Sequence, residues 1–216
     1  MTTAELKPLV YVVDDDPMLG PALTMMLEQE GLEVRLFSSA ESFLAALAKS
    51  MVSTSHLVPI NCCAIVDVCM PGMDGLQLQE FLCAQAILIP LIFLTGKGSI
   101  PMSVNAIKAG AEDFLTKPVS RELLMASVHA AIQKSIVWHE QNQRQMVGKK
   151  RLSTLTPREM EIVSMTIEGL PNKQIARLLD ISLRTVEHHK TNILTKTGTI
   201  NSLELSRLVQ ESGILI

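Results

Sequence analysis

Three carboxylates, one hydroxyl and one ammonium group stand at the ends of successive short apolar runs in the first half of the chain. They belong to Asp14, Asp15, Asp67, Thr95 and Lys117. Carboxylates that lie close together repel one another, so their pKa values rise unless a cation neutralises them, and hard oxygen ligands favour Mg²⁺. We therefore predict an Mg²⁺ site in which Asp15 and Asp67 bind the metal directly and Asp14 binds it through water. A carboxylate held there can attack phosphorus, while the metal and Lys117 neutralise charge on the transferred group.

The apolar runs that carry these side chains are predicted strands, because each is short and is followed by a helical pattern. The expected strands are Leu9–Val13, Val34–Phe37, Cys62–Asp67, Leu91–Thr95 and Phe114–Thr116. The expected helices are Pro17–Glu30 with Asp16 as its N-cap, Ser39–Ala48, Gly75–Ala86, Ile100–Ala109 and Ser120–Ile136. This alternation predicts an α/β fold, a doubly wound five-stranded parallel sheet with helices on both faces. Ligands of such sheets bind at the C-terminal ends of the strands, where the five side chains should converge.

The chain is long enough for two domains. We assign residues 1–136 to the first domain and residues 153–216 to an all-α domain of four helices. Residues 137–152 are polar and are predicted to form a linker that continues the preceding helix only part of the way. The segment Lys49–Asn61 is polar and irregular, which predicts a long surface loop.

The second domain opens with a capping box, in which Thr156 is the N-cap, Pro157 the first helical residue and Glu159 the third. Gly169 ends this helix, and further helices are predicted at Asn172–Leu179, Leu183–Lys196 and Ser202–Glu211. The third of these four helices has a core face of Val186, Ile193 and Thr197, and its opposite face is polar. That polar face carries Arg184, Glu187, His188, Thr191, Asn192 and Thr195.

A short helix, a tight turn and a polar-faced helix make the helix-turn-helix plan, whose last helix enters the DNA major groove. From the pattern alone, an ordinary helical bundle with a solvated face is the alternative. Charge supports the first interpretation weakly: residues 1–140 carry a net −7, residues 141–150 a net +3 and residues 151–216 a net +1. An acidic control domain and a mildly basic nucleic-acid domain fit this division.

Membrane and secreted classes are not expected. No apolar run is long enough for a membrane span, and the N-terminus has no signal-peptide pattern, so a cytoplasmic protein is predicted. The cysteines have no spacing that fits a zinc site and are expected to be reduced thiols. They are Cys62, Cys63, Cys69 and Cys83.

About residues 8–130 resemble the receiver domains of two-component response regulators, which have a flavodoxin-like fold. The resemblance lies in the segments Val12–Asp16, Asp67–Gly75, Leu94–Gly96 and Asp113–Pro118. It implies that Asp67 is the phospho-acceptor, that Asp14 and Asp15 are metal-site acids and that the backbone carbonyl of Cys69 is the third protein ligand of Mg²⁺. It also implies that Thr95 and Lys117 contact the phosphoryl oxygens, and that the Lys117–Pro118 bond is cis.

The receiver resemblance also implies a switch. Phe114 takes the position of the family's switch aromatic, which is expected to swing inward when Thr95 moves toward the phosphoryl group. Two features depart from the family's pattern. Cys69 stands where Asn or Arg is commoner, which we expect to alter the phosphoryl lifetime, and the segment Lys49–Asn61 is longer than usual.

About residues 153–210 resemble the LuxR-type domain of the NarL/FixJ class of regulators. The resemblance lies in the segments Leu155–Glu159, Gly169–Ala176 and Arg184–His189. It implies that Glu187, His188 and Thr191 read bases. His189 lies nearer the core side of the same helix and is therefore expected to be structural. The residues implied to contact the DNA backbone are Lys173, Arg184, Thr185, Lys190, Asn192 and Lys196.

Together these features predict a response regulator rather than an enzyme. We expect a sensor histidine kinase to phosphorylate Asp67, and the phosphorylated homodimer to bind double-stranded promoter DNA and to activate transcription with RNA polymerase. Two alternatives are weighed against this. A phosphatase or phosphotransferase with Asp67 as nucleophile would want a second acid two residues later, where Cys69 stands. A phosphorylation-independent DNA-binding regulator with a vestigial receiver is disfavoured by the intact set of Asp14, Asp15, Asp67, Thr95 and Lys117.

Overall fold

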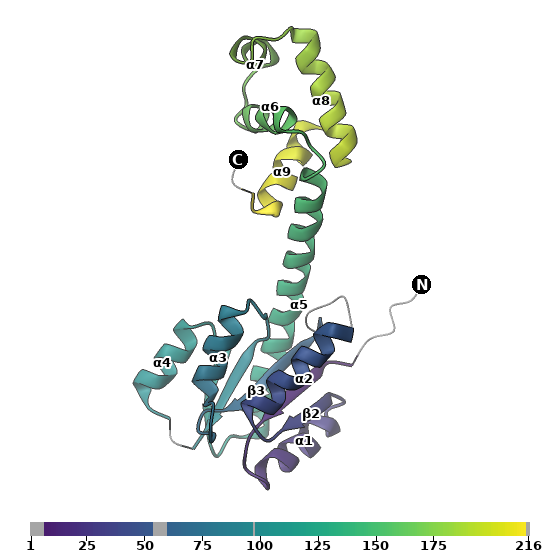
Figure 1. Cartoon of the computed structure of the whole chain (residues 1–216). Helices are drawn as coiled ribbons and strands as arrows, with labels where there is room; N and C mark the ends of the chain where they lie inside the picture. Colours follow the sequence, from purple (N-terminus) through teal and green to yellow (C-terminus); the bar gives the residue numbers. More distant parts are fainter. Residues whose placement is uncertain (1–6, 54–59, 97, 215–216) are drawn as a thin grey trace. The chain divides into compact units, whose positions relative to one another are not determined.

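A computed structural model describes residues 7–53, 60–96 and 98–214 of the chain. The chain divides into two compact units, Met1–His139 and Glu140–Ile216 (Figure 1), and each is described by itself. In the part of the chain that the structure describes, no helix is both long enough and apolar enough to cross a membrane.

The first unit is built on a five-stranded parallel sheet. Its strands are β1 (Leu9–Val13), β2 (Glu33–Phe37), β3 (Cys62–Asp67), β4 (Leu91–Thr95) and β5 (Asp113–Thr116). Their order is β2-β1-β3-β4-β5, so the chain reverses its direction of winding between β1 and β3. Every residue of β1, β3 and β4 is buried, because helices cover both faces, and this is why these strands appear as continuous apolar runs. The predicted doubly wound sheet is confirmed.

Five helices cover this sheet. They are α1 (Leu19–Gln29), α2 (Ala40–Ser53), α3 (Gly75–Ala84), α4 (Ile100–Lys108) and α5 (Arg121–Leu152). One apolar core lies against α2, α3 and α4 and contains Phe43 and Leu78. The other lies against α1 and α5 and contains Leu27 and Leu124. Figure 1 shows α2, α3 and α4 along one face of the sheet.

Helix α4 is attached to the domain more lightly than its neighbours. Ala106 is its one buried residue, whereas the adjacent helix α3 buries four, among them Leu78 and Leu82. Near the C-terminal end of α4, the buried side chain of Gln79 on α3 donates a hydrogen bond to the carbonyl oxygen of Ala106 at 3.1 Å.

Several predicted boundaries in the first unit were wrong, among them the end of α3, which lies at Ala84 rather than Ala86 because Ala86 adopts a left-handed conformation (φ 53°). Helix α1 begins at Leu19 rather than Pro17, because the Asp16 carboxylate accepts the N–H groups of Met18 and Leu19 at 2.8 and 3.2 Å and forms a turn before the helix. Helix α2 continues to Ser53, since no glycine or proline interrupts residues 49–53. The predicted loop Lys49–Asn61 is therefore helical at its start, and residues 54–59 lie outside the described residues.

Helix α5 runs through the whole of residues 137–152, where we had expected a helix only in part. The polar composition suggested a linker, but the segment contains no proline, and Lys149, Lys150 and Arg151 in the last turn suit the negative end of the helix dipole. Its last residue, Leu152, is buried in the core of the second unit. Gly148 allows close packing there, because a Cβ at this position would lie 3.0 Å from Cβ of Ser212.

The second unit packs α6 (Pro157–Ile167), α7 (Asn172–Leu178), α8 (Leu183–Thr197) and α9 (Ser202–Ser212) around an apolar core that includes Ile162, Ile175 and Ile193. The predicted capping box of Thr156 and Glu159 is confirmed at the start of α6. Thr197 is buried in this core, and its hydroxyl is within hydrogen-bond distance of the Ile193 carbonyl (2.7 Å) and the Thr199 hydroxyl (2.8 Å). These hydrogen bonds satisfy a polar group that would otherwise destabilise the core.

Candidate functional site

Three carboxylates meet at the C-terminal edge of the sheet in the first unit. Strands β1 and β3 pair in parallel with Val13 beside Val66, so the next residues, Asp14 and Asp67, lie side by side. Carboxylate oxygens of Asp14, Asp15 and Asp67 all lie within 4.8 Å of one another. Asp14 and Asp67 are buried, and Asp15 is exposed. A set of three carboxylates open to solvent on one side fits a hard divalent cation such as Mg²⁺, which these residues would hold.

Lys117 supplies a positive charge to this cluster. Its Nζ lies 2.9 Å from Oδ2 of Asp14 and 3.2 Å from Oδ2 of Asp67. Burial alone lowers the pKa of Lys117, but the hydrogen bonds and negative charges of Asp14 and Asp67 outweigh it and hold the pKa above its usual value. The ammonium is therefore charged throughout the physiological range. The Lys117–Pro118 bond is cis, as predicted, and the backbone N–H of Lys117 donates to the carbonyl of Thr95 at 2.8 Å.

Backbone amides donate hydrogen bonds to two of the three acids. The N–H of Asp16 donates to Oδ1 of Asp14 at 2.9 Å, and the N–H of Cys69 donates to Oδ1 of Asp67 at 3.4 Å. Both amides belong to the loops that leave the strand ends, so each loop helps to orient the acid that precedes it. Oδ2 of both acids is directed toward Lys117, as the ion pairs require.

Thr95 and Phe114, the predicted switch residues, lie on neighbouring strands. Thr95 pairs with Thr116, so Phe114, two residues earlier on β5, is on the same face of the sheet as Thr95. Thr95 is fully buried, whereas Phe114 is only partly buried, with its ring 6.0 Å from that of Phe93. Gly98 lies against both side chains: a Cβ there would be 2.9 Å from Phe114 and 3.2 Å from Thr95. Gly98, two residues before the start of α4, is thus a close neighbour of both predicted switch residues.

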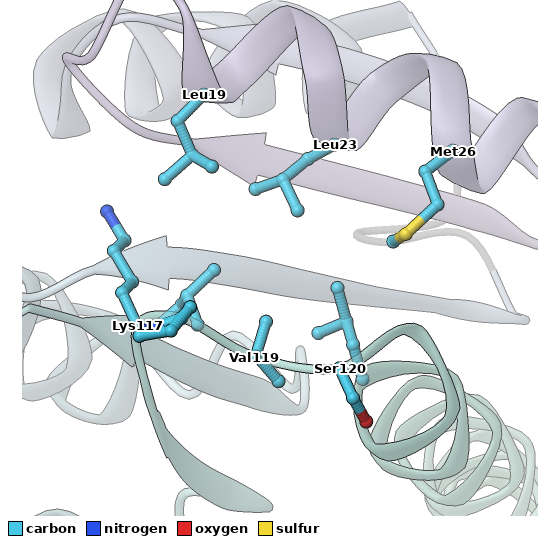
Figure 2. Close-up of a pocket in the computed structure, with 9 residues that line it drawn as sticks. Leu19, Leu23, Met26, Lys117, Val119 and Ser120 are labelled. Carbon is cyan, nitrogen blue, oxygen red and sulfur yellow. The ribbon is translucent and has the colours of Figure 1, made fainter.

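A cavity of about 460 Å³ lies next to the cluster, on the side of α1 and α5. Figure 2 shows Leu19, Leu23 and Met26 of α1 facing Val119 and Ser120, with Lys117 at one end. Lys117 is thus shared between the cavity and the acidic cluster. The sequence pattern did not indicate this cavity, because nearly all its lining residues are of the types that fill a core.

Helix α8 presents the predicted polar face in the second unit. Val186, Ile193 and Thr197 are buried, as predicted. On the opposite face, Asn192 is half-buried with its Nδ2 3.2 Å from Nε2 of His188, and the other predicted residues are exposed. These exposed residues are Arg184, Glu187, His188, Thr191 and Thr195. The turn before α8 is tight, with Asp180 in a left-handed conformation (φ 53°) and Ser182 as the N-cap of α8.

Lys196 has a structural partner that the sequence did not reveal. Its Nζ lies 2.8 and 2.7 Å from the two carboxylate oxygens of Glu159, whose side chain is only 4% exposed. Burial raises the pKa of Glu159, but the hydrogen bonds from Lys196 and Thr156 outweigh it and lower the pKa from 4.5 to about 2. The pair joins the end of α8 to the start of α6, so it helps to set the orientation of the polar-faced helix.

Replacement of Glu159 by glutamine is expected to destabilise the second unit by about 1–3 kcal/mol at neutral pH, because a buried partner of a charge is lost. We expect the lower part of this range, since the Lys196 side chain is 39% exposed. A depressed carboxyl pKa contributes stability above its unfolded value and loses it as pH falls through its folded value. The difference from wild type should therefore shrink between pH 4.5 and about 2.

Urea denaturation followed by circular dichroism would measure this difference at each pH. Glu161→Gln is the matched control, because Glu161 forms an exposed ion pair with Arg158 and its loss should change stability by less than about 0.5 kcal/mol. Equal stabilities of the Glu159 and Glu161 variants would contradict a structural role for the Lys196 pair.

The first unit has a sheet of order β2-β1-β3-β4-β5 with three acids, a threonine and a lysine at its strand ends, and the second unit is a helix-turn-helix. This combination defines a response regulator with a DNA-binding output domain. Comparison with known families agrees: the response regulator receiver domain matches residues 10–129, and the luxR family of bacterial regulatory proteins matches residues 153–209. The chain belongs to the two-component response regulators of the NarL/FixJ class. It is a transcriptional regulator and not an enzyme.

Relatives match all or nearly all of the chain. The transcriptional regulatory protein FixJ of Bradyrhizobium diazoefficiens is 36% identical over 215 residues, which cover 100% of this chain and 99% of that protein. The response regulator protein TodT of Pseudomonas putida is 37% identical over 202 residues, covering 94% and 85% respectively. Among solved structures, the response regulator StyR matches 95% of this chain and 100% of its own, with 37% identity and a TM-score of 0.77.

Proposed function

We propose that a sensor histidine kinase phosphorylates this protein on Asp67. The observation that carries the proposal is the arrangement of Asp67, which is buried beside Asp14, bonded to Lys117 and within reach of Asp15. In the transfer, Oδ of Asp67 would form a bond to phosphorus as the kinase's phosphohistidine bond breaks. Lys117 would exchange a carboxylate partner for a phosphoryl oxygen and so neutralise its charge.

Mg²⁺ is the proposed cofactor, held by Asp14, Asp15, Asp67 and the backbone carbonyl of Cys69. When bound, it would neutralise charge on the transferred phosphoryl group. The chain's own residues orient the reacting carboxylate: the Cys69 amide donates to Oδ1 of Asp67, and Lys117 bonds to Oδ2.

Asp15→Asn is expected to weaken Mg²⁺ binding at least about tenfold, because a neutral amide replaces the exposed carboxylate of the cluster. Titration calorimetry of the full chain would measure the affinity. Asp16→Asn is the control: Asp16 lies beside Asp15 but outside the cluster, and asparagine can retain its bonds to Met18 and Leu19. If both variants bind Mg²⁺ as wild type does, the proposed metal site is refuted.

The output would be a change in DNA binding. Phosphorylation adds nearly two negative charges next to Thr95 and would draw its hydroxyl toward the phosphoryl group, with Phe114 following through the contact at Gly98. This change would favour a homodimer, and two helix-turn-helix units would then bind a two-part site in promoter DNA. We further propose that the dimer activates transcription through RNA polymerase and acts in the cytoplasm, where its DNA target would lie.

In the proposed complex, Glu187, His188 and Thr191 of α8 read bases. The proposed backbone contacts are Lys173, Arg184, Thr185, Lys190, Asn192 and Lys196. The Lys196 ammonium already forms an ion pair with Glu159, so its contact with phosphate would be made in addition to this pair. Partial burial lowers the pKa of Lys190. The aliphatic part of its side chain can lie along the helix while the ammonium reaches solvent, where it could contact phosphate.

The experiment that tests the proposed function measures DNA binding and molar mass together. A duplex would be selected from a random pool with the full chain, and binding would be measured with and without beryllofluoride and Mg²⁺. Tighter binding with a shift from monomer to dimer would support the proposal. No change in either quantity would favour the alternative, a regulator that binds DNA independently of phosphorylation.

A further inference from the structure

The loop between β3 and α3, residues 68–74, follows the phospho-acceptor directly and is held at both of its ends. Its two ends are joined to each other, because the N–H of Gly75, the first residue of α3, donates to the carbonyl of Val68 at 3.0 Å. The ends also pack closely: a Cβ at Gly75 would lie 2.5 Å from the carbonyl oxygen of Asp67. At its end, Asp74 and Gln77 form a capping box on α3. Both restraints are local, because they join residues that are close together in the sequence.

A third restraint comes from a different element. Glu41, in the first turn of α2, accepts the backbone N–H of Met73 at 3.0 Å through Oε1. This hydrogen bond is the largest cause that lowers the pKa of Glu41, so the carboxylate is ionised at neutral pH. A charged acceptor makes a stronger hydrogen bond than a neutral one.

The backbone of the loop is shaped to admit this carboxylate. Gly72 adopts φ +77°, a conformation that favours glycine, and a Cβ at Gly72 would lie 2.7 Å from Oε1 of Glu41. The carboxylate thus lies against the backbone of Gly72 as well as the amide of Met73. Helix α2 provides a firm base for it, because Ala40 and Phe43, on either side of Glu41 in the sequence, are fully buried.

We propose that Glu41 is a positioning residue for phosphoryl transfer at Asp67, which acts by fixing the loop that carries Cys69. The proposal rests on the proposed function, since Cys69 matters there in two ways: its N–H donates to Oδ1 of Asp67, and its carbonyl is the proposed metal ligand. Without Glu41 the middle of the loop keeps the packing of Met70 and Met73 but loses its polar tie to α2. Cys69 is exposed and has no side-chain burial to hold it.

Glu41→Ala should weaken Mg²⁺ affinity and slow phosphorylation by phosphoramidate, each by about tenfold. This is the low end of the range for residues that orient a metal ligand without touching the metal. Glu41→Gln keeps an oxygen acceptor for Met73 and should stay within about threefold of wild type. Glu122→Ala is the matched control, because Glu122 is also an exposed glutamate in the first turn of a helix, and its bonds are within that turn. It should leave both quantities unchanged.

Titration calorimetry would give the Mg²⁺ affinity, and mass spectrometry of the intact chain would follow phosphorylation. Hydrogen exchange at the Met73 amide should accelerate in Glu41→Ala but not in Glu122→Ala. If Glu41→Ala exchanges faster at Met73 yet binds Mg²⁺ and is phosphorylated as wild type is, the positioning role is overturned while the proposed function stands. If wild type itself is not phosphorylated, both the proposed function and this inference fail.

Discussion

Asp67→Asn is expected to abolish phosphorylation of the full chain, with at least a thousandfold loss of rate. The amide is a poor nucleophile toward phosphorus, and the other two acids differ from Asp67: Asp14 is held closer to Lys117, at 2.9 Å against 3.2 Å, and Asp15 is exposed. Mass spectrometry after incubation with phosphoramidate and Mg²⁺ would measure the loss. DNA binding by this variant should no longer respond to the phosphodonor.

Asp74→Asn is the control for this prediction. Asp74 is a half-buried aspartate in the loop that follows Asp67, and it caps α3, a role that asparagine performs as well. Its phosphorylation rate should equal that of wild type. Retention of phosphorylation in Asp67→Asn would assign the phosphoryl group to another residue, and loss in both variants would point to damage to the loop instead.

Glu187→Ala is expected to reduce discrimination at one base pair of the selected duplex by about 1–3 kcal/mol, because a carboxylate that accepts from a cytosine amino group is removed. Affinity for unrelated duplexes should rise slightly, since the same change removes a negative charge from the exposed face of α8. Fluorescence anisotropy with the selected duplex and its single-base variants would measure both effects.

Lys173→Ala provides the contrast. Lys173 is exposed in the first turn of α7, and as a phosphate contact its loss should weaken binding to all duplexes alike and reduce the salt slope by about 1. Glu211→Ala on α9 is the control for removal of an exposed carboxylate in the same unit. Glu187 would be excluded as a base reader if its variant weakened every duplex equally.

The sheet and the acidic cluster could be predicted because their signals are local. Five apolar runs, each followed by a helical pattern, determine the parallel sheet, and parallel strands bring Asp14, Asp67 and Lys117 to one edge whatever the details of packing. The capping box of Thr156 and Glu159 was equally readable, since its members are three residues apart.

The missed features depend on residues that are far apart in the sequence or on competition between local bonds. Nothing in the spacing of Glu159 and Lys196, or of Glu41 and Met73, indicates that they meet. Asp16 was correctly expected to accept backbone amides, but its bonds form a turn ahead of α1 and delay the helix. Polarity of residues 137–152 indicated exposure, and exposure was mistaken for loss of helical structure.

Because α4 buries a single residue, the free energy needed to displace it is smaller than the free energy needed to displace α1. Moving α1 away from the sheet would expose Leu23 and Leu27, at about 2 kcal/mol for each side chain. Moving the start of α4 would leave the hydrogen bond between Gln79 and Ala106 in place and expose little more than part of Met102. Displacement of the N-terminal end of α4 therefore requires less free energy than displacement of α1. A signal of a few kcal/mol can remodel that surface while both apolar cores stay intact.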